Sequence, residues 1–519
     1  MAWEKQIDEI HERRRRAMQQ GGEDAIARQH AKGRLSLRER IDALLDGDTF
    51  REQGIGAGAA ELDDDGKLRD FTPANFILGL GEIDGRACVI GGEDFTLKGG
   101  SPNAAGLRKS VYAETLACQY RVPLIRLHEG GGGSVGGTGG KGPRGPVGEP
   151  VYAPPRFRSV ARAMATVPVV SAALGPVAGL PAARLVASHF TVMTKATAQI
   201  LIAGPAVVER ALGVQISKED LGGPDVHLVN GVIDNAAEDE ADAFAQIRRF
   251  LSYLPQNVWE LAPHVATDDE RNRRDEKLRA IVPADRRKPY DMRKLIAAIA
   301  DAGSVFEMTR RYGPGQITCL ARLNGHTVGI FANDCRFYAG AMTSDGARKV
   351  RRFIEFCETF HLPIVALVDE PGFMIGPDAE RAGTIRDGTA AVLAAADCET
   401  PWATIVVRKS FGVAQAAHFG ADAYVLAWPS AEMGALPVEG GVAVAFGREI
   451  AAAADPEAKR QELEAMLAAR QSPFPRAESF AFHELIDPAE TRPALCDWLD
   501  WIQPGLAALK GPRSFSMRP

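Results

Sequence analysis

Residues 121–127 read Arg-Val-Pro-Leu-Ile-Arg-Leu, and residues 361–367 read His-Leu-Pro-Ile-Val-Ala-Leu. The offset between the two stretches is 240 positions (363 − 123). Further on, Val-Pro-Val-Val at 167–170 is matched by Thr-Pro-Trp-Ala at 400–403, at an offset of 233 (401 − 168). The chain therefore contains two copies of one unit, and a pair of related units generally builds one site from two related loops.

Each copy has the same predicted order of elements. A hairpin rich in Gly and Val is followed by a helix, a Pro-headed apolar strand, a Gly-containing loop, a helix, a second Pro-headed strand and a Gly turn into a helix. Strand-turn-helix units in series predict mainly parallel strands, with the site at their C-terminal ends. We predict an α/β protein with tandem domains at 1–262 and 290–519, joined by a charged linker at 263–289, with a helical arm over 4–47.

Bulk properties agree with a two-domain globular protein. The chain has 519 residues, 45% of them hydrophobic and 25% charged, which exceeds the size that one core supports. The net charge of −6 argues against a nucleic-acid binder. The four arginines at 13–16 are flanked by acidic residues at helical spacing, so we interpret them as one solvated face of a helix.

The seven cysteines are scattered and form no Cys-x-x-Cys pair, which argues against a zinc ribbon and against a disulfide framework. A reducing, cytoplasmic location and no metal are the expectations. The N-terminus is charged and lacks the apolar core of a secretion signal. The longest apolar stretch, 165–186, is interrupted by Pro and Gly, so we predict no membrane span.

The glycine tract at 130–142 matches no catalytic motif well. A phosphate-binding P-loop would need Gly at position 135 and Ser or Thr at position 142, where this chain has Val135 and Gly142. The tract also contains a Gly-x-Ser-x-Gly pattern around Ser134, but more Gly and Pro follow where that motif needs a helix. Two interpretations stay open, a flexible loop and a lid that closes over a ligand.

Two strand-to-helix turns are the more specific signal. Residues 174–183 read Leu-Gly-Pro-Val-Ala-Gly-Leu-Pro-Ala-Ala, and residues 408–415 occupy the same place in the second copy. Such a turn points free backbone N–H groups at an anion, and Pro181 suits the first turn of a helix. Two amide pairs would suit a reaction in which negative charge develops on two carbonyl oxygens, such as a thioester and a urea.

The chain resembles the β (carboxyltransferase) subunits of biotin-dependent acyl-CoA carboxylases, the group of propionyl-CoA and methylcrotonyl-CoA carboxylases. The resemblance extends essentially from end to end. The motifs that carry it stand in the family's order, at 37–41, 94–96, 99–101, 175–179, 221–223, 331–333, 369–373, 408–412, 427–429 and 486–488.

The resemblance implies two tandem crotonase-like domains, with acyl-CoA on the first domain of one protomer and carboxybiotin on the second domain of another. Carried over, the amides of Gly179 and Leu180 would hold the thioester oxygen, and those of Val413 and Ala414 the biotin ureido oxygen. Backbone stabilisation of the two enolates would replace side-chain catalysis. The substrate-binding residues expected around these turns are Gly131, Gly132, Gly133, Ala178, Gly372, Phe373, Gly412 and Gln415.

The resemblance also implies partners. A shared site requires at least a dimer, and the family commonly forms hexamers. No ATP-binding region and no Met-Lys-Met carrier motif is found, Lys195 being the nearest and a poor match. Biotin is therefore expected on a biotin carboxylase and carboxyl carrier α subunit, and the coenzyme A thioester is the substrate.

Several positions depart from the family pattern. Leu180 and Val413 stand where the family usually has Gly, Asp387 replaces a His, and 433–437 replaces a Met-Gly-Gly turn. The altered pocket prevents transfer of a particular acyl chain. Alternatives are a decarboxylase of the same fold acting on a malonyl-type CoA, and a catalytically silent assembly partner. A simple enoyl-CoA hydratase would need only one such domain.

Overall fold

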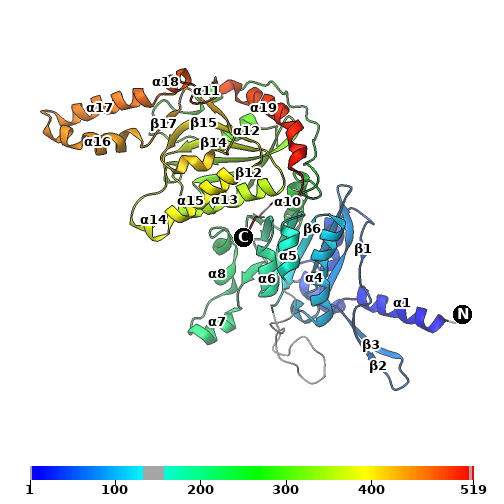
Figure 1. Ribbon diagram of the computed structural model, residues 1–519. Helices are drawn as coiled ribbons and strands as arrows, with labels where there is room; N and C mark the ends of the chain where they lie inside the picture. The colour runs from blue at the N-terminus through cyan, green and yellow to red at the C-terminus, as the bar shows by residue number, and fades with distance from the viewer. Residues whose placement is uncertain (1–2, 133–156, 514–516, 519) are drawn as a thin grey trace. The chain divides into compact units, whose positions relative to one another are not determined.

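The computed structural model describes residues 3–132, 157–513 and 517–518. The chain forms two compact units, residues 1–258 and 259–518 (Figure 1).

The first unit begins with a helical arm, α1 (Glu4–Met18), α2 (Glu23–His30) and α3 (Leu37–Leu44). α3 begins with a capping box, in which the Ser36 side chain accepts from the Glu39 amide and the Glu39 side chain accepts from the Ser36 amide. This reciprocal pair satisfies two of the amides that a helix leaves unpaired at its start. The arm predicted over 4–47 is therefore helical, in three pieces.

The first unit is built around a sheet with strand order β1-β4-β5-β6-β7-β8-β10, and β9 also pairs with β7. β1, β4 and β5 pair antiparallel, and all the pairs from β5 onward are parallel. β2 and β3 form a separate hairpin. The elements are β1 (Arg51–Glu52), β2 (Gly58–Leu62), β3 (Leu68–Pro73), β4 (Phe76–Ile83), β5 (Arg86–Glu93), η1 (Lys98–Gly100), α4 (Ala104–Tyr120), β6 (Leu124–Gly130), α5 (Phe157–Met164), β7 (Val169–Ala178), α6 (Leu180–Val186), β8 (Phe190–Thr194), β9 (Gln199–Leu201), α7 (Pro205–Leu212), α8 (Lys218–Gly222), α9 (Pro224–His227), β10 (Asn235–Ala237) and α10 (Glu240–Ser252).

The second unit repeats this topology, with the order β11-β12-β13-β14-β15-β16-β18 and β17 on β15. Figure 1 shows its helices α16 and α17 side by side, extending away from the sheet. The elements are α11 (Leu278–Ile281), α12 (Met292–Ile299), β11 (Phe306–Met308), β12 (Gln316–Leu323), β13 (His326–Asn333), η2 (Tyr338–Gly340), α13 (Ser344–Thr359), β14 (Ile364–Glu370), α14 (Pro377–Arg381), α15 (Thr384–Asp397), β15 (Trp402–Phe411), η3 (Ala414–His418), β16 (Tyr424–Ala427), β17 (Glu432–Gly434), α16 (Val438–Ala452), α17 (Pro456–Gln471), α18 (Pro473–Glu478), β18 (Glu484–Leu485), η4 (Pro488–Glu490), α19 (Thr491–Leu506) and η5 (Ala507–Leu509).

The sequence repeat is also a repeat of strand register. Leu124 of β6 pairs with Val169 of β7, and Ile364 of β14 pairs with Trp402 of β15. The first partners differ by 240 positions (364 − 124) and the second by 233 (402 − 169). The offset is therefore 240 between β6 and β14, and 233 between β7 and β15. The difference between these offsets arises because the connection between the two strands is longer in the first copy than in the second.

The central strands are buried along their whole length, as expected for parallel strands covered on both faces. Every residue of β6 and of β14 is buried. In the first unit α4 packs against β4 and β5, and the Phe190 and Phe250 rings stack with centroids 4.8 Å apart. Each such fully buried apolar side chain contributes roughly 1.5–3 kcal/mol to stability.

The charged segment 263–289, expected to connect two domains, lies within the second unit. Leu278 belongs to the core of that unit, and Arg273 donates to the carbonyl of Ala298 at 2.7 Å. Arg492 of α19 in turn donates to the carbonyl of Glu270 at 3.0 Å. The segment is held by hydrogen bonds from arginine side chains to backbone carbonyls. Its low content of apolar residues gave no indication of these bonds. Within the described parts of the chain, no helix is long and apolar enough to cross a membrane.

Candidate functional site

The first candidate turn joins β7 to α6. Gly179 has a positive φ of 64°, and its amide donates to the carbonyl of Leu201 on β9 at 3.3 Å. The next amide, that of Leu180, has no acceptor among the described residues. Pro181 has no N–H. Within this turn, Leu180 therefore carries the amide that is available to a ligand.

The glycine tract begins directly against this turn. A Cβ added to Gly179 would lie 2.7 Å from Cα of Gly132, and a Cβ on Gly132 would lie 2.8 Å from the carbonyl oxygen of Ala178. Side chains have no room at either position. The structure thus brings Gly132, Ala178 and Gly179 together. Gly131 adjoins them and donates to Gly99 O at 3.1 Å, whereas Gly133 and the tract that follows lie outside the described residues.

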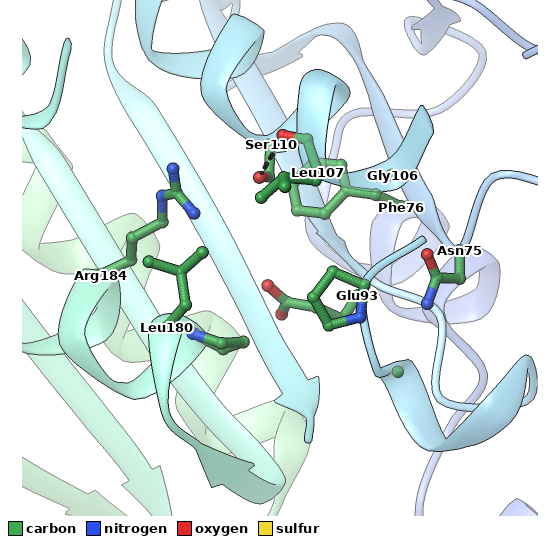
Figure 2. A pocket seen from close by; sticks show the side chains of 11 residues that line it. Asn75, Phe76, Glu93, Gly106, Leu107, Ser110, Leu180 and Arg184 are labelled. Carbon is green, nitrogen blue, oxygen red and sulfur yellow. Dashed lines mark hydrogen bonds between the residues drawn. The ribbon is translucent and has the colours of Figure 1, made fainter. Parts of the chain in front are cut away.

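A narrow pocket adjoins the Leu180 turn, with about 10 Å³ of free volume, room for about one water molecule. Figure 2 shows the Leu180 and Arg184 side chains on one side of it, facing the carboxylate of Glu93. Phe76 and Leu107 supply apolar walls. The remaining lining residues are Asn75, Gly100, Pro102, Gly106, Ser110 and Pro181.

The second candidate turn joins β15 to η3 and repeats the geometry of the first. Gly412 has a φ of 65°, and its amide donates to the carbonyl of Gly434 on β17 at 3.2 Å. The amides of Val413 and Ala414 have no acceptor among the residues that the structure describes. The Val413 side chain is 64% exposed and Ala414 is buried. Two neighbouring amides are therefore available in this turn, against one in the first.

The three other residues predicted for the second copy also lie close to β14 and β15. Ser410 Oγ donates to Gln415 Oε1 at 2.8 Å, which ties Gln415 to the last residues of β15. Gly372 has a φ of 128° and donates to Glu370 Oε1 at 3.0 Å. The Phe373 ring packs so closely on α15 that a Cβ at Gly388 would lie 2.3 Å from it.

Glu370 forms a buried polar cluster that the sequence analysis did not identify. It is fully buried at the end of β14, and Asn333 Nδ2 donates to its Oε2 at 2.9 Å. His418 Nε2 lies 3.3 Å from the same oxygen. Burial raises the pKa of the Glu370 carboxyl, while the hydrogen bonds from His418 and Asn333 oppose that shift. No spacing rule links 333, 370 and 418, so only the fold could reveal this cluster.

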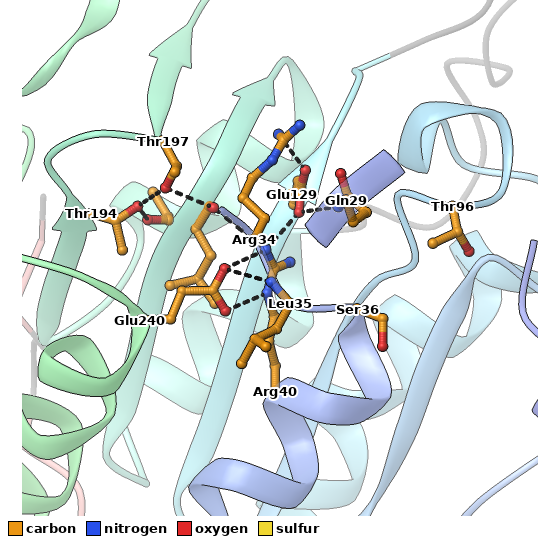
Figure 3. Close-up of polar contacts among 12 residues, drawn as sticks. Gln29, Arg34, Leu35, Ser36, Arg40, Thr96, Glu129, Thr194, Thr197 and Glu240 are labelled. Carbon is orange, nitrogen blue, oxygen red and sulfur yellow. Dashed lines mark hydrogen bonds and ion pairs between the residues drawn. The ribbon is translucent and has the colours of Figure 1, made fainter. Parts of the chain in front are cut away.

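A second buried cluster surrounds Glu129, the residue before the glycine tract (Figure 3). Arg34 of the helical arm donates to Glu129 Oε1 at 2.6 Å, and Arg40 Nη2 lies 2.7 Å from Oε2. Gln29 Nε2 donates to Oε2 at 2.8 Å. Arg40 also pairs with Glu240 at 2.8 Å. The arm is thereby held to the sheet at the strand end that leads into the candidate site.

The second copy has Asp369 at the position of Glu129 (369 − 129 = 240), with a cation from a different source. Arg408 of β15 pairs with Asp369 at 2.8 Å. The residue that corresponds to Arg408 in the first copy is Gly175 (408 − 233). A Cβ there would lie 2.5 Å from the Glu129 carboxyl carbon. A side chain at position 175 would therefore overlap the Glu129 carboxylate, whose cations come from the helical arm instead.

These turns can stabilise oxyanions through direct amide hydrogen bonds. Because α6 has seven residues and η3 has five, the dipole of a long helix contributes little at either turn. Preorganised amides aimed at a carbonyl oxygen stabilise an enolate in a site that excludes water. In the described part of the chain, no group of three or more His, Cys, Asp or Glu residues is arranged to hold a metal ion.

Comparison with known proteins shows the family of the chain. A family model for the carboxyl transferase domain matches residues 28–503. The propionyl-CoA carboxylase carboxyltransferase subunit of Haloferax mediterranei is 35% identical over 507 residues, covering 95% of this chain and 95% of that protein. The methylmalonyl-CoA decarboxylase subunit alpha of Veillonella parvula is 33% identical over 501 residues, covering 96% and 95%.

A solved structure is similar over nearly the whole chain. The crystal structure of transcarboxylase 12S, a hexamer with methylmalonyl-coenzyme A and methylmalonic acid bound, is similar with a TM-score of 0.86 at 31% identity, over 99% of this chain and 96% of that one. The prediction of two tandem crotonase-like domains is confirmed by this match and by the two similar sheets. The chain belongs to the carboxyl transferase domain family, as a carboxyltransferase of the biotin-dependent acyl-CoA carboxylase and decarboxylase group.

Proposed function

We propose that this protein is the carboxyltransferase subunit of an acyl-CoA carboxylase that moves CO2 from carboxybiotin on a partner to the α, or vinylogous γ, carbon of a short or branched acyl-CoA. The observation that carries the proposal is the repeated turn. Gly179 and Gly412 have nearly the same φ and donate to equivalent strands, and each is followed by an amide without an acceptor among the described residues.

The first turn would bind the thioester. The Leu180 amide would donate to the thioester oxygen, and its hydrogen bond would strengthen as the enolate forms. The Gly179 amide already donates to the carbonyl of Leu201 at 3.3 Å. In this proposal the main role of Gly179 is therefore to allow the backbone to turn. Its amide could bind the thioester oxygen only if the hydrogen bond to Leu201 opened. The Leu180 side chain, which lines the narrow pocket, would limit the length and branching of the acyl group.

The second turn would bind the ureido oxygen of biotin through the amides of Val413 and Ala414. Biotin, carried by the partner, would supply CO2 and accept a proton when bound. The two available amides and the anchored Gln415 suit a fixed, planar urea group. Acyl-CoA on the first unit and biotin on the second remain assignments of this proposal.

The reverse direction is the second candidate, because a relative that is 33% identical is named as a methylmalonyl-CoA decarboxylase subunit. The same two turns would serve it, since the enolates are the same in both directions. Direction is decided by the partner, a biotin carboxylase for synthesis or a membrane sodium-pump subunit for decarboxylation.

The proposal is tested by co-purifying the protein with its biotinylated partner and measuring ATP- and bicarbonate-dependent carboxylation of a series of acyl-CoAs. We expect carboxylation of at least one short or branched acyl-CoA. Binding of CoA esters with no carboxylation and no CO2 exchange in either direction would instead indicate an assembly partner.

The purified protein is expected to carry no covalent biotin. Lys195, the nearest match to a carrier lysine, forms an ion pair with Glu238 and lacks the Met-Lys-Met context. An avidin blot of the protein, compared with its biotinylated partner on the same membrane, checks this. A positive band at 55.7 kDa would contradict it.

Activity is expected to disappear when the protein is diluted to monomers. The reason is that the site is proposed to join the first unit of one protomer to the second unit of another, and the related 12S protein is described as a hexamer. Sedimentation and activity would be measured over the same dilution series. Full specific activity in a species shown to be monomeric would overturn the shared site.

A further inference from the structure

The pocket beside Leu180 contains a carboxylate that backbone catalysis does not use. Glu93 is the last residue of β5, is only 6% exposed, and lines the pocket together with Leu180 and Arg184. Figure 2 shows its carboxylate between the end of its own strand and the start of α6. Carboxylates are seldom buried without a purpose or a partner, because removing their charge from water is costly.

Glu93 is oriented by a single buried side chain. His128, on the neighbouring strand β6, is 1% exposed, and its Nδ1 lies 3.0 Å from Glu93 Oε2. In the described structure no donor reaches Glu93 Oε1, and His128 Nε2 is buried without a hydrogen-bond partner. Oε2 is therefore held by the histidine, and Figure 2 shows the carboxylate facing Leu180 and Arg184 across the pocket. A base aimed at a reacting position and fixed by a second group is the usual geometry of proton transfer.

In the described structure, Arg126 and Arg184 form their ion pairs with Glu114 and not with Glu93. Arg184, on the far side of the pocket, donates through Nε to Glu114 at 2.8 Å. Arg126 donates to the same Glu114 oxygen at 3.2 Å. Both cations pair with Glu114, and Nη2 of Arg184, which lines the pocket, is buried without a hydrogen-bond partner in the described structure.

The second copy has no carboxylate at the position equivalent to Glu93. The position corresponding to Glu93 is Asn333 (333 − 93 = 240), and its side chain donates to the carbonyl of Gly340 at 3.1 Å and to Glu370. An amide cannot accept a proton at neutral pH. At this position the duplication has therefore placed a carboxylate in the first copy and an amide in the second.

We propose that Glu93 is an acid-base residue of the acyl-CoA site, positioned by His128, which removes and returns the α-proton of the acyl-CoA without biotin. This rests on the proposed function of the Leu180 turn. The Glu93 carboxylate takes the proton from the α-carbon, the C–H electron pair becomes the enolate, and the charge on the thioester oxygen is held by the Leu180 amide. Reversal returns a proton to carbon and regenerates the carboxylate.

The experiment uses the protein alone, without partner or biotin, and propionyl-CoA as the probe in D2O. Incorporation of deuterium at the α-carbon is followed by mass spectrometry. We expect exchange above the uncatalysed rate, and Glu93→Gln should slow it by about 10² or more, the usual contribution of a positioned acid or base. The matched control is Glu61→Gln on the exposed strand β2, which should exchange at the wild-type rate.

Further variants separate catalysis from folding. Glu93→Asp keeps a carboxylate at a shifted position and should retain more exchange than Glu93→Gln at equal affinity for propionyl-CoA. His128→Gln should lower the maximal exchange rate by about tenfold without changing the half-saturating propionyl-CoA concentration, because it disturbs only the aim of the carboxylate.

The outcomes are distinguishable. Propionyl-CoA binding without exchange in the wild type, or equal exchange in wild type and Glu93→Gln, would overturn the inference. If carboxylation with the biotinylated partner is normal in that case, the proposed function survives. If the protein neither binds CoA esters nor carboxylates them, both the proposed function and this inference are overturned.

Discussion

Gly179→Val is expected to lower the turnover of the co-purified complex by about 10² or more, the scale of losing one oxyanion donor. Two independent features lead to this. The φ of 64° disfavours any residue with a Cβ, and a β-branched one most of all. The new Cβ would also lie 2.7 Å from Cα of Gly132. Relief of this overlap must move the turn, and the Leu180 amide moves with it. Steady-state carboxylation of the best acyl-CoA measures the loss.

Leu180→Ala is the matched control for that experiment. The substitution leaves the amide in place and shortens a side chain that lines the pocket. It should therefore change which acyl chains are accepted, with a gain for longer or branched ones, and leave turnover on the best substrate within about tenfold. A Gly179→Val protein that is folded, oligomeric and nearly fully active would mean that the thioester binds elsewhere.

Glu129→Ala is expected to destabilise the protein by about 3–5 kcal/mol, the usual result of removing one partner from a buried charge cluster. Arg34, which is 6% exposed, would lose its carboxylate, and Arg40 would keep only Glu240. Urea denaturation followed by tryptophan fluorescence and circular dichroism gives the change. The loss should include the attachment of the helical arm, so proteolysis within residues 4–44 should accelerate.

Glu61→Ala on the exposed strand β2 is the control, with an expected change within ±0.5 kcal/mol. Glu129→Gln should fall between the two, because it keeps the shape and one acceptor but loses the charge. An unchanged unfolding midpoint for Glu129→Ala would show that the arginines find other partners.

The tandem architecture was predictable because the duplication appears in local sequence. Pro-headed apolar strands and Gly turns depend on neighbouring residues, so the offsets of 240 and 233 survive in the chain and reappear in strand register. The positions of Gly179 and Gly412 were predictable for the same reason, since a left-handed turn between a strand and a helix selects glycine locally.

The use of each amide was not predictable. Gly179 donates to Leu201, and Gly412 to Gly434, only because β9 and β17 return to the ends of β7 and β15. From the sequence, the amides of Gly179 and Leu180 were predicted to bind the thioester oxygen together. The pairing of β9 with β7, which occupies the Gly179 amide, is a tertiary contact that the sequence does not reveal. The same limit applies to Glu93, whose role depends on a histidine 35 residues away on the next strand.

The sequence by itself determined the duplicated α/β fold, the family and the two glycine turns, because each of these is encoded by short-range patterns that repeat. The tertiary structure alone decided which amides are available, which cations accompany Glu129 and Asp369, and which carboxylate faces the pocket. These are contacts between residues far apart in the chain, and their energies depend on distance and burial, which no local pattern specifies.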